Sequence, residues 1–174
     1  RGFREALVNA FVHRDYARLG AVHVRLDASG LLISNPGGFV EGVTLENLLV
    51  TEPRPRNPLL ADIVKRIGLA ERTGRGIDRI FEGLVRFGRP LPDYSRSDSN
   101  TVVLRMSDAD ADIAFLEMVI SLEERRGPLH LDSLLILSRL REERRAGIEE
   151  LAKMTQKGEV ETRACVERLL EEGL

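Results

Sequence analysis

Three polar residues near the start of the chain have the spacing of one helix face. Glu5, Asn9 and His13 are four residues apart, so a helix over residues 3–13 places them in one column. An amide oxygen is a hard ligand that suits Mg²⁺, and a carboxylate can orient or deprotonate a water molecule. Glu5 and Asn9 therefore fit a Mg²⁺–water site, and they equally fit the solvated face of an amphipathic helix.

Two glycine turns follow this helix. Gly37 and Gly38 come after a predicted strand, where backbone without side chains allows a ligand to approach closely. Gly74, Arg75 and Gly76 precede a predicted helix over residues 77–87, and the free N–H groups of a helix N-terminus favour phosphate. Arg75 lies between the two glycines, where it would neutralise phosphate charge. An ordinary turn and a helix cap are the alternative interpretations.

The sequence lacks the motifs of several other kinds of functional site. The sequence has no phosphate-binding P-loop and no serine nucleophile elbow, and the single cysteine, Cys165, excludes an internal disulfide. Hydrophobic residues make up 43% and charged residues 31% of the chain, and no apolar run is long enough to span a membrane. We expect a cytoplasmic protein without a membrane partner, and a chain that is a fragment of a longer one.

Hydrophobic periodicity and turn residues predict the elements that must position these groups. Asn57 is the expected cap of a helix with an inward apolar stripe of Leu59, Leu60, Ile63, Val64 and Ile67. The predicted helices cover 3–13, 44–49, 57–67, 77–87, 109–126, 132–144, 148–155 and 160–170, and the predicted strands cover 21–27, 31–34 and 101–106.

Three stretches in this order, residues 4–16, 31–39 and 57–80, resemble the GHKL-type (histidine-kinase- and gyrase-like) ATPase domain of transcriptional regulators often described as RecG-like DNA helicases. Such proteins typically carry an upstream Schlafen-type AlbA domain and a downstream helix-turn-helix. The resemblance implies an α+β chain in which residues 1–107 form a mixed sheet with helices on one face, lacking the start of that domain.

The resemblance also implies roles for individual residues. Glu5 matches the water-activating base and Asn9 matches the Mg²⁺ ligand of bound ATP. Asn35 and Gly37, with Gly38 beside them, match the turn that packs on adenine. Gly74 and Gly76, which flank Arg75, match the glycines beside the phosphates. Two positions depart from the family pattern, because Asn35 stands where aspartate is usual and Arg72 where glycine is usual.

The C-terminal part resembles a winged helix-turn-helix that lacks its wing, over residues 131–174. Its candidate DNA contacts are Lys157, Arg163 and Arg168. Residues 108–174 hold 10 basic and 16 acidic residues, and this acidity works against phosphate neutralisation by the fragment alone. Residues 108–130 form a linker helix, which either braces a dimer or packs on its own domain.

These observations lead to one main hypothesis and two alternatives. The main hypothesis is a homodimeric transcriptional regulator in which ATP and Mg²⁺ in the GHKL-like domain change the arrangement of a DNA-binding winged helix. The first alternative is a weak Mg²⁺-dependent ATPase in which Glu5 is the base. The second is a degenerate scaffold that binds no nucleotide and serves dimerisation.

Overall fold

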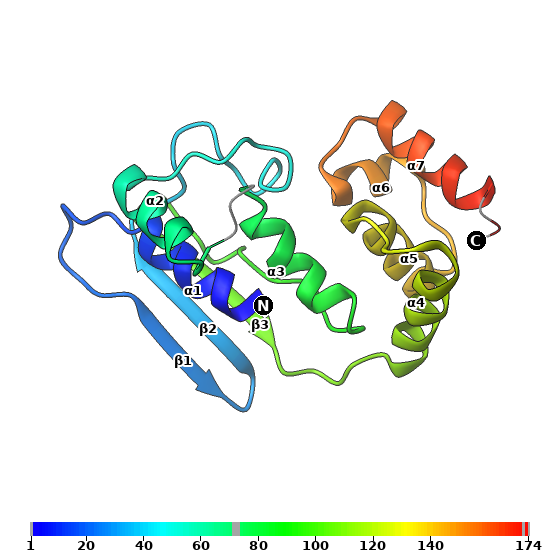
Figure 1. Ribbon diagram of the computed structural model, residues 1–174, viewed down its shortest axis with the longest axis horizontal. Coiled ribbons are helices and arrows are strands. Elements are labelled where there is room, and N and C mark those ends of the chain that lie inside the picture. Colours follow the sequence, from blue (N-terminus) through cyan, green and yellow to red (C-terminus); the bar gives the residue numbers. More distant parts are fainter. Residues whose placement is uncertain (1, 71–73, 172, 174) are drawn as a thin grey trace.

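A computed structural model describes residues 2–70, 74–171 and 173 (Figure 1). Arg72, which departs from the family pattern, lies outside these residues. The described residues form an α+β chain of seven helices and three strands. In chain order these are α1 (Gly2–Val12), β1 (His23–Asp27), β2 (Gly30–Pro36), α2 (Pro58–Arg66), α3 (Gly76–Val85), β3 (Thr101–Ser107), α4 (Ile113–Arg126), α5 (Leu131–Glu143), α6 (Ile148–Thr155) and α7 (Glu159–Glu171).

The sheet has the order β1-β2-β3 and its three described strands pair only antiparallel. The mixed sheet implied by the resemblance is therefore wrong for this part of the chain. The reason is local, since β1 and β2 form a tight hairpin and β3 returns beside β2. Gly30 ends the hairpin turn with φ +119°, and a side chain there would clash with the carbonyl group of Met106.

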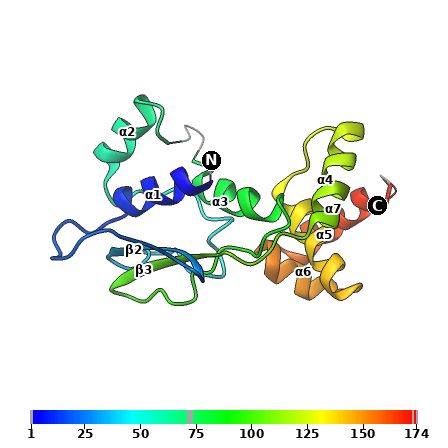
Figure 2. The same ribbon diagram turned by 90° about the horizontal axis from the view of Figure 1, so that it is seen from below.

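Helices α1 and α3 cover one face of the sheet, as Figure 2 shows. Side chains alternate between the two faces of a strand, and the inward-facing Ile33, Leu104 and Met106 are buried. Helix α1 presents Ala6 and Ala10 to this core, and these small side chains allow the helix to lie close to the strands. This packing fixes the orientation of the polar column on α1.

The segment over residues 44–49 is not the helix that we predicted. It forms successive turns, in which Asn47 accepts a hydrogen bond from the N–H of Thr44 at 2.7 Å and donates one to the carbonyl of Gly42 at 2.9 Å. An asparagine side chain that bonds the nearby main chain competes with helical hydrogen bonds. The result is an irregular segment, and residues 44–53 are called the strap below.

Helix α2 forms where predicted, but only part of its apolar stripe faces inward, since Leu60 and Val64 are half-buried. Leu59, Ile63 and Ile67 are 83%, 54% and 64% exposed, and Ala61 is the buried residue of the helix. Asn57 does not cap α2 with its side chain. Its amide donates instead to the carbonyls of Val12 and Arg14, both at 2.8 Å, and so fastens α2 to the end of α1.

The four C-terminal helices pack around α5 (Figure 1). Leu134 and Leu135 of α5 belong to the main core, whereas Ile136 belongs to a second cluster with Leu151 and Leu169. Helix α4 contributes Phe115, Val119 and Leu122 to the main core, so it packs on its own chain.

Helix α4 also has an exposed apolar side. Ile113 and Ile120 of this helix are exposed. In the part of the chain that the structure describes, no helix is long and apolar enough to cross a membrane.

Candidate functional site

A cavity of about 320 Å³ lies beside α1, at the N-terminal end of α3. Helix α2 and the segment over residues 38–55 complete its wall. Of the eight residues predicted for catalysis and nucleotide binding, all but Gly37 line this cavity, namely Glu5, Asn9, Asn35, Gly38, Gly74, Arg75 and Gly76. Residues up to 71 positions apart in sequence, Glu5 and Gly76, are therefore brought to one place.

Glu5 and Asn9 meet the first residue of α3. A Cβ atom placed on Gly76 would lie 3.2 Å from Oδ1 of Asn9 and 3.6 Å from Oε2 of Glu5. Glu5 is only 2% exposed, and Arg4 lies 3.8 Å from its carboxylate. A carboxylate, an amide and the N-terminus of a helix thus converge on one wall of the cavity, a donor set that suits hydrated Mg²⁺ and phosphate.

Gly74 allows the turn before α3 to approach the strap. Its φ is +77°, and a side chain there would clash with Pro53. Arg75 follows at the N-cap position of α3 and lines the cavity. The same wall contains Asp78, which the sequence analysis missed; burial raises the pKa of its carboxyl group, and the nearby Asp132 adds to this effect.

Asn35 and Gly38 also line the cavity. Asn35 is 3% exposed, and its amide nitrogen donates to the carbonyl of Pro36 at 3.3 Å. Among the described residues, no hydrogen bond to its amide oxygen is formed, so this oxygen can accept one. A Cβ placed on Gly38 would lie 2.5 Å from the carbonyl oxygen of Asp98. Only glycine therefore allows the backbone to pass this close to Asp98.

Gly37 does not line the cavity, although the sequence analysis placed it beside the nucleotide. Its φ is +94°, and a Cβ on it would lie 2.7 Å from Cβ of Asp15. Its N–H donates to the carbonyl of Asn100 at 2.7 Å. Gly37 therefore serves the packing of the neighbouring loops.

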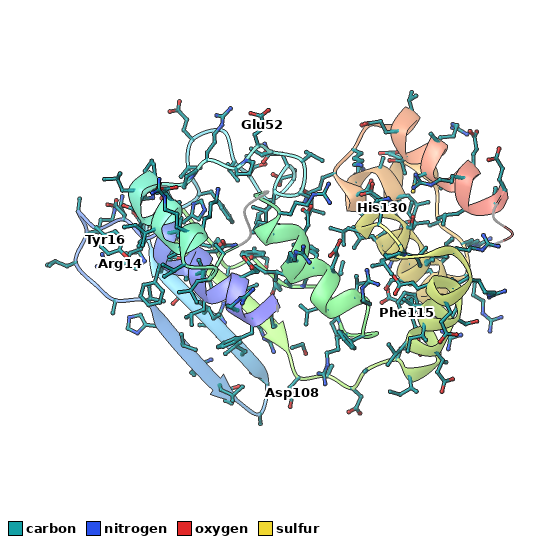
Figure 3. All side chains as sticks on the ribbon, viewed as in Figure 1. Arg14, Tyr16, Glu52, Asp108, Phe115 and His130 are labelled. Atoms are coloured by element: carbon teal, nitrogen blue, oxygen red, sulfur yellow. The ribbon has the colours of Figure 1, made fainter. Side chains whose placement is uncertain are left out.

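His13 and Arg14 are adjacent in sequence, but only His13 lines the cavity. Burial, with the guanidinium of Arg56, lowers the pKa of the His13 imidazole. Arg14 lies 4.5 Å above the ring of Tyr16 and donates to the carbonyl of Gly20. Figure 3 shows Arg14 and Tyr16 at the outer end of the domain, and Arg14 is not part of the cavity wall.

The sequence analysis missed several other wall residues. The rings of Phe39 and Tyr94 have centroids 6.2 Å apart and, with Leu48 and Leu49, give the cavity an apolar side. Burial raises the pKa of the Tyr94 hydroxyl group far above its usual range. Lys65 also lines the cavity, one helical turn after the buried Ala61. The sequence did not signal this position, because the predicted apolar stripe of α2 did not include Ala61.

Glu52 belongs to the same strap and lies at its outer rim (Figure 3). The strap is therefore mixed in character, with apolar Leu48 and Leu49 on the cavity side and a carboxylate at the rim. Among the described residues no cluster of three or more histidine, cysteine or acidic side chains is arranged to hold a metal ion.

The candidate DNA contacts differ in their availability. Lys157 donates to the carboxylate of Asp132 at 2.6 Å, and this hydrogen bond raises the pKa of the lysine. Arg163 and Arg168 are exposed on α7, and Arg168 also lies 3.4 Å from the sulfur of Cys165. The lysine is thus already occupied within the chain.

A glutamine that the sequence analysis did not single out joins the helices to the cavity wall. Gln156 lies in the turn between α6 and α7 and accepts a hydrogen bond from the N–H of Leu49 at 2.6 Å. Its amide nitrogen donates to the carbonyl of Leu45 at 2.7 Å. No local pattern reveals such a contact, because the partners are 107 and 111 residues apart.

Residues 20–105 match the family model described as "Putative ATP-dependent DNA helicase recG C-terminal". The match includes Asn35 and both glycine turns and begins after α1, so it does not contain Glu5 or Asn9. It supports an ATP-related function for this part of the chain. A comparison with curated proteins gives no match.

A solved structure, that of the DIP2311 protein from Corynebacterium diphtheriae, is similar over nearly the whole chain. The TM-score is 0.81 at 29% sequence identity, over 96% of this chain and 30% of that one. The present chain therefore spans less than a third of that protein's length. Together with the α+β fold, the match over residues 20–105 supports a RecG-like ATPase-related family for this chain.

Proposed function

We propose that the chain is the nucleotide-sensing part of a transcriptional regulator, in which the cavity beside α1 binds ATP with Mg²⁺. The observation that carries the proposal is the convergence of Glu5, Asn9 and Gly76 on one wall. A carboxylate, an amide oxygen and a helix N-terminus are the groups that a hydrated cation and a phosphate chain require. A GHKL-like arrangement of this half of the chain is part of the proposal.

The lining of the cavity offers groups for both parts of a nucleotide. Phe39, Tyr94 and Leu49 offer apolar surface to a purine ring, and the amide oxygen of Asn35 would accept a hydrogen bond from its amino group. The phosphates would lie by Gly74, Arg75 and Gly76. Adenine is preferred in this arrangement because guanine has a carbonyl where adenine carries that amino group.

Asn9 is the residue that would hold Mg²⁺, which it would share with phosphate oxygens. The metal would offset the negative charge of the phosphates beside the buried Glu5. Gly76 fits this role because a larger residue would press on the amide of Asn9, with a Cβ 3.2 Å from its oxygen. Arg75 and Lys65 add positive charge to the same wall.

The DNA-binding part of the proposal rests on α6 and α7, within a truncated winged helix over residues 131–174. Arg163 and Arg168 are exposed on α7 and would contact phosphates of the duplex. Lys157 would first have to leave Asp132. A homodimer would supply a second set of these cations, and the exposed Ile113 and Ile120 of α4 offer an apolar contact for it.

Gln156 supports a connection between the cavity and the C-terminal helices α6 and α7. It holds the main chain of Leu45 and Leu49 with both ends of its amide, and Leu49 lines the cavity. A nucleotide that moves this strap would act on the turn between α6 and α7. Binding of ATP and binding of DNA would then be coupled in both directions, as thermodynamic linkage requires.

The test compares DNA affinity and oligomeric state of the intact protein with and without Mg²⁺-ATP, with Mg²⁺-GTP in a parallel series. We expect ATP to change DNA affinity at least fivefold, the lower end of measured coupling, and GTP to have a weaker effect. If neither nucleotide binds, the domain is a scaffold for dimerisation. If ATP binds without changing either property, the regulatory part is wrong.

A second candidate function, ATP hydrolysis, is favoured by the position of Glu5. This carboxylate is buried in the cavity wall beside Asn9, where it would take a proton from the attacking water. The protein would then be a weak Mg²⁺-dependent ATPase. Steady-state release of inorganic phosphate by wild-type protein and by Glu5→Gln tests this function.

A further inference from the structure

A second cavity, of about 230 Å³, lies on the face of the sheet opposite the first one. In Figure 2, no described helix covers this face. The wall is predominantly polar and comes from three separate segments. Its residues are Arg25, Asp27, Ser29, Gly30, Leu31, Leu32, Arg96 and Arg105.

The sheet register brings two of the arginines to this face. Arg25 of β1 pairs with Leu32 of β2, and Leu32 pairs with Arg105 of β3. The neighbours Ile33 and Leu104 are buried under the helices, so the alternation of side chains turns this row outward. The backbones of Arg25 and Arg105 are two strand spacings apart, roughly 10 Å, a gap that two long side chains can close around one ligand.

A loop brings the third arginine. Asp93 and Arg105 exchange two main-chain hydrogen bonds, at 2.9 and 2.8 Å, so the chain before Tyr94 extends the sheet beyond β3. The carboxylate of Asp93 then accepts the N–H of Ser95 at 2.8 Å. This turn directs the exposed Arg96 back to the cavity.

The two nearby carboxylates are already engaged. Asp27 accepts hydrogen bonds from the hydroxyl and N–H groups of Ser29, and Arg25 lies 3.0 Å from its other oxygen. Asp93 is bonded to Ser95. Hydrogen bonds from these serines are the main cause of the lowered pKa of each aspartate, and Arg105 lowers both further.

Arg96 and Arg105 retain their hydrogen-bond donors. Within the described part of the chain neither guanidinium makes a side-chain hydrogen bond or an ion pair, although Arg105 is half-buried. A guanidinium presents five N–H donors in a planar fork that matches the oxygens of phosphate. Three arginines against two occupied carboxylates leave a positive surplus on this face.

We propose that this outer cavity binds a phosphate group through Arg96 and Arg105, with Arg25 completing the set. The polar wall and the unfilled guanidinium donors favour a small, multiply charged oxyanion over an apolar ligand. The site is on the opposite face of the sheet from the ATP cavity, and it does not depend on the proposed nucleotide function.

The test is a titration of ¹⁵N-labelled intact protein with inorganic phosphate, followed by amide chemical shifts. We expect saturable shifts in the row through Leu32 and Arg105, and an affinity at least tenfold weaker in Arg105→Gln and in Arg96→Gln. Arg96 is in an exposed loop, so that variant tests the site even if Arg105→Gln folds poorly. Arg145→Gln, at an exposed arginine of the α5–α6 connection, is the matched control and should bind as wild type.

A parallel titration with a 12-base-pair DNA duplex distinguishes the source of the phosphate. If duplex binding weakens in Arg105→Gln and its salt dependence falls by about one counterion, the ligand is a phosphodiester backbone. If only inorganic phosphate responds, the ligand is a small phosphate compound. Equal affinity of all variants for both ligands, or no saturable binding of either, would overturn the proposal.

Discussion

Gln156 and Leu49 are 107 residues apart in sequence, and the N–H of Leu49 donates to the side-chain oxygen of Gln156 at 2.6 Å. Gln156 adopts a left-handed conformation with φ 58°, which directs its amide toward the strap. Because Leu49 lines the larger cavity, one side chain of the C-terminal helices holds the wall of the candidate nucleotide site. Substitution of Gln156 therefore tests whether ATP binding in the cavity is coupled to DNA binding by the C-terminal helices.

Gln156→Gly removes the amide and keeps the backbone conformation, because glycine adopts positive φ readily. We expect the free energy of unfolding to fall by about 1 kcal/mol, the range of one or two net hydrogen bonds less the relieved backbone strain. We also expect the effect of ATP on DNA affinity to disappear. Fluorescence anisotropy of labelled DNA with and without Mg²⁺-ATP measures this effect.

Arg144→Gly is the control for Gln156→Gly. Arg144 is exposed and ends α5 in the same left-handed conformation, with φ 59°. This variant should retain the full response to ATP. An ATP response that survives in Gln156→Gly would show that the coupling, if present, runs elsewhere.

Gly76→Ala should weaken Mg²⁺-ATP binding at least fivefold without unfolding the protein. The added Cβ lies 3.2 Å from the oxygen of Asn9, closer than an ordinary contact, so the amide must shift from its position. Gly83→Ala makes the same change in the same helix, where the new Cβ would contact Gly2 at an ordinary 3.5 Å. Calorimetry should find wild-type affinity for Gly83→Ala, and equal losses in both variants would contradict the placement of Gly76 at the ligand.

Glu5→Gln should abolish any ATP turnover and leave Mg²⁺-ATP bound within about threefold of the wild-type affinity. The amide has nearly the same shape as the carboxylate but cannot accept the proton of the attacking water. Phosphate release measured alongside a binding titration separates the two effects. Turnover that persists in Glu5→Gln would remove Glu5 from the mechanism.

His13 should make the protein less stable in mild acid. Because burial and Arg56 lower the pKa of His13 in the folded chain, the unfolded chain binds the proton first as the pH falls below about 6.5. The free energy of unfolding should therefore decrease as the pH falls from 6.5 through the lowered pKa of His13 in the folded chain. His13 should cause no change between pH 7.5 and 8.5. Urea denaturation across this range measures the slope.

His13→Gln should flatten that slope, whereas His23→Gln, in exposed strand β1, should keep it. Both variants remove one imidazole, so their difference reports the surroundings of His13. An unchanged slope in His13→Gln would show that other groups cause the acid sensitivity.

The sequence predicted the local elements well because their signals are local. The column of Glu5 and Asn9 follows from helical spacing alone. The burial of Ile33 was not predicted, because residues 31–33 are a continuous apolar run that does not show which side chain faces inward. The glycine turn at Gly74 and Gly76 was predicted from residue type. The structure adds the reason, which is the approach of Pro53 to one glycine and of Asn9 to the other.

The misplaced predictions depend on contacts between distant segments. The apolar stripe of α2 predicts burial, but Leu59 and Ile63 are exposed and Ala61 is the buried residue of the helix. Gly37 has the same residue type as Gly38, but it does not line the cavity and packs instead against Asp15, a contact that no local pattern predicts. Gln156 gave no signal, since its partners are main-chain atoms more than 100 residues away.

The most direct test of the account is a calorimetric titration of Mg²⁺-ATP into the intact wild-type protein and Asn9→Ala, with thermal unfolding as a check of the fold. We predict one binding site per chain in the wild type and an affinity at least tenfold weaker in Asn9→Ala, because the amide oxygen is the proposed protein ligand of Mg²⁺. The difference should vanish when EDTA replaces Mg²⁺. Absence of ATP binding to the wild type, or equal binding by a folded Asn9→Ala, would contradict the account.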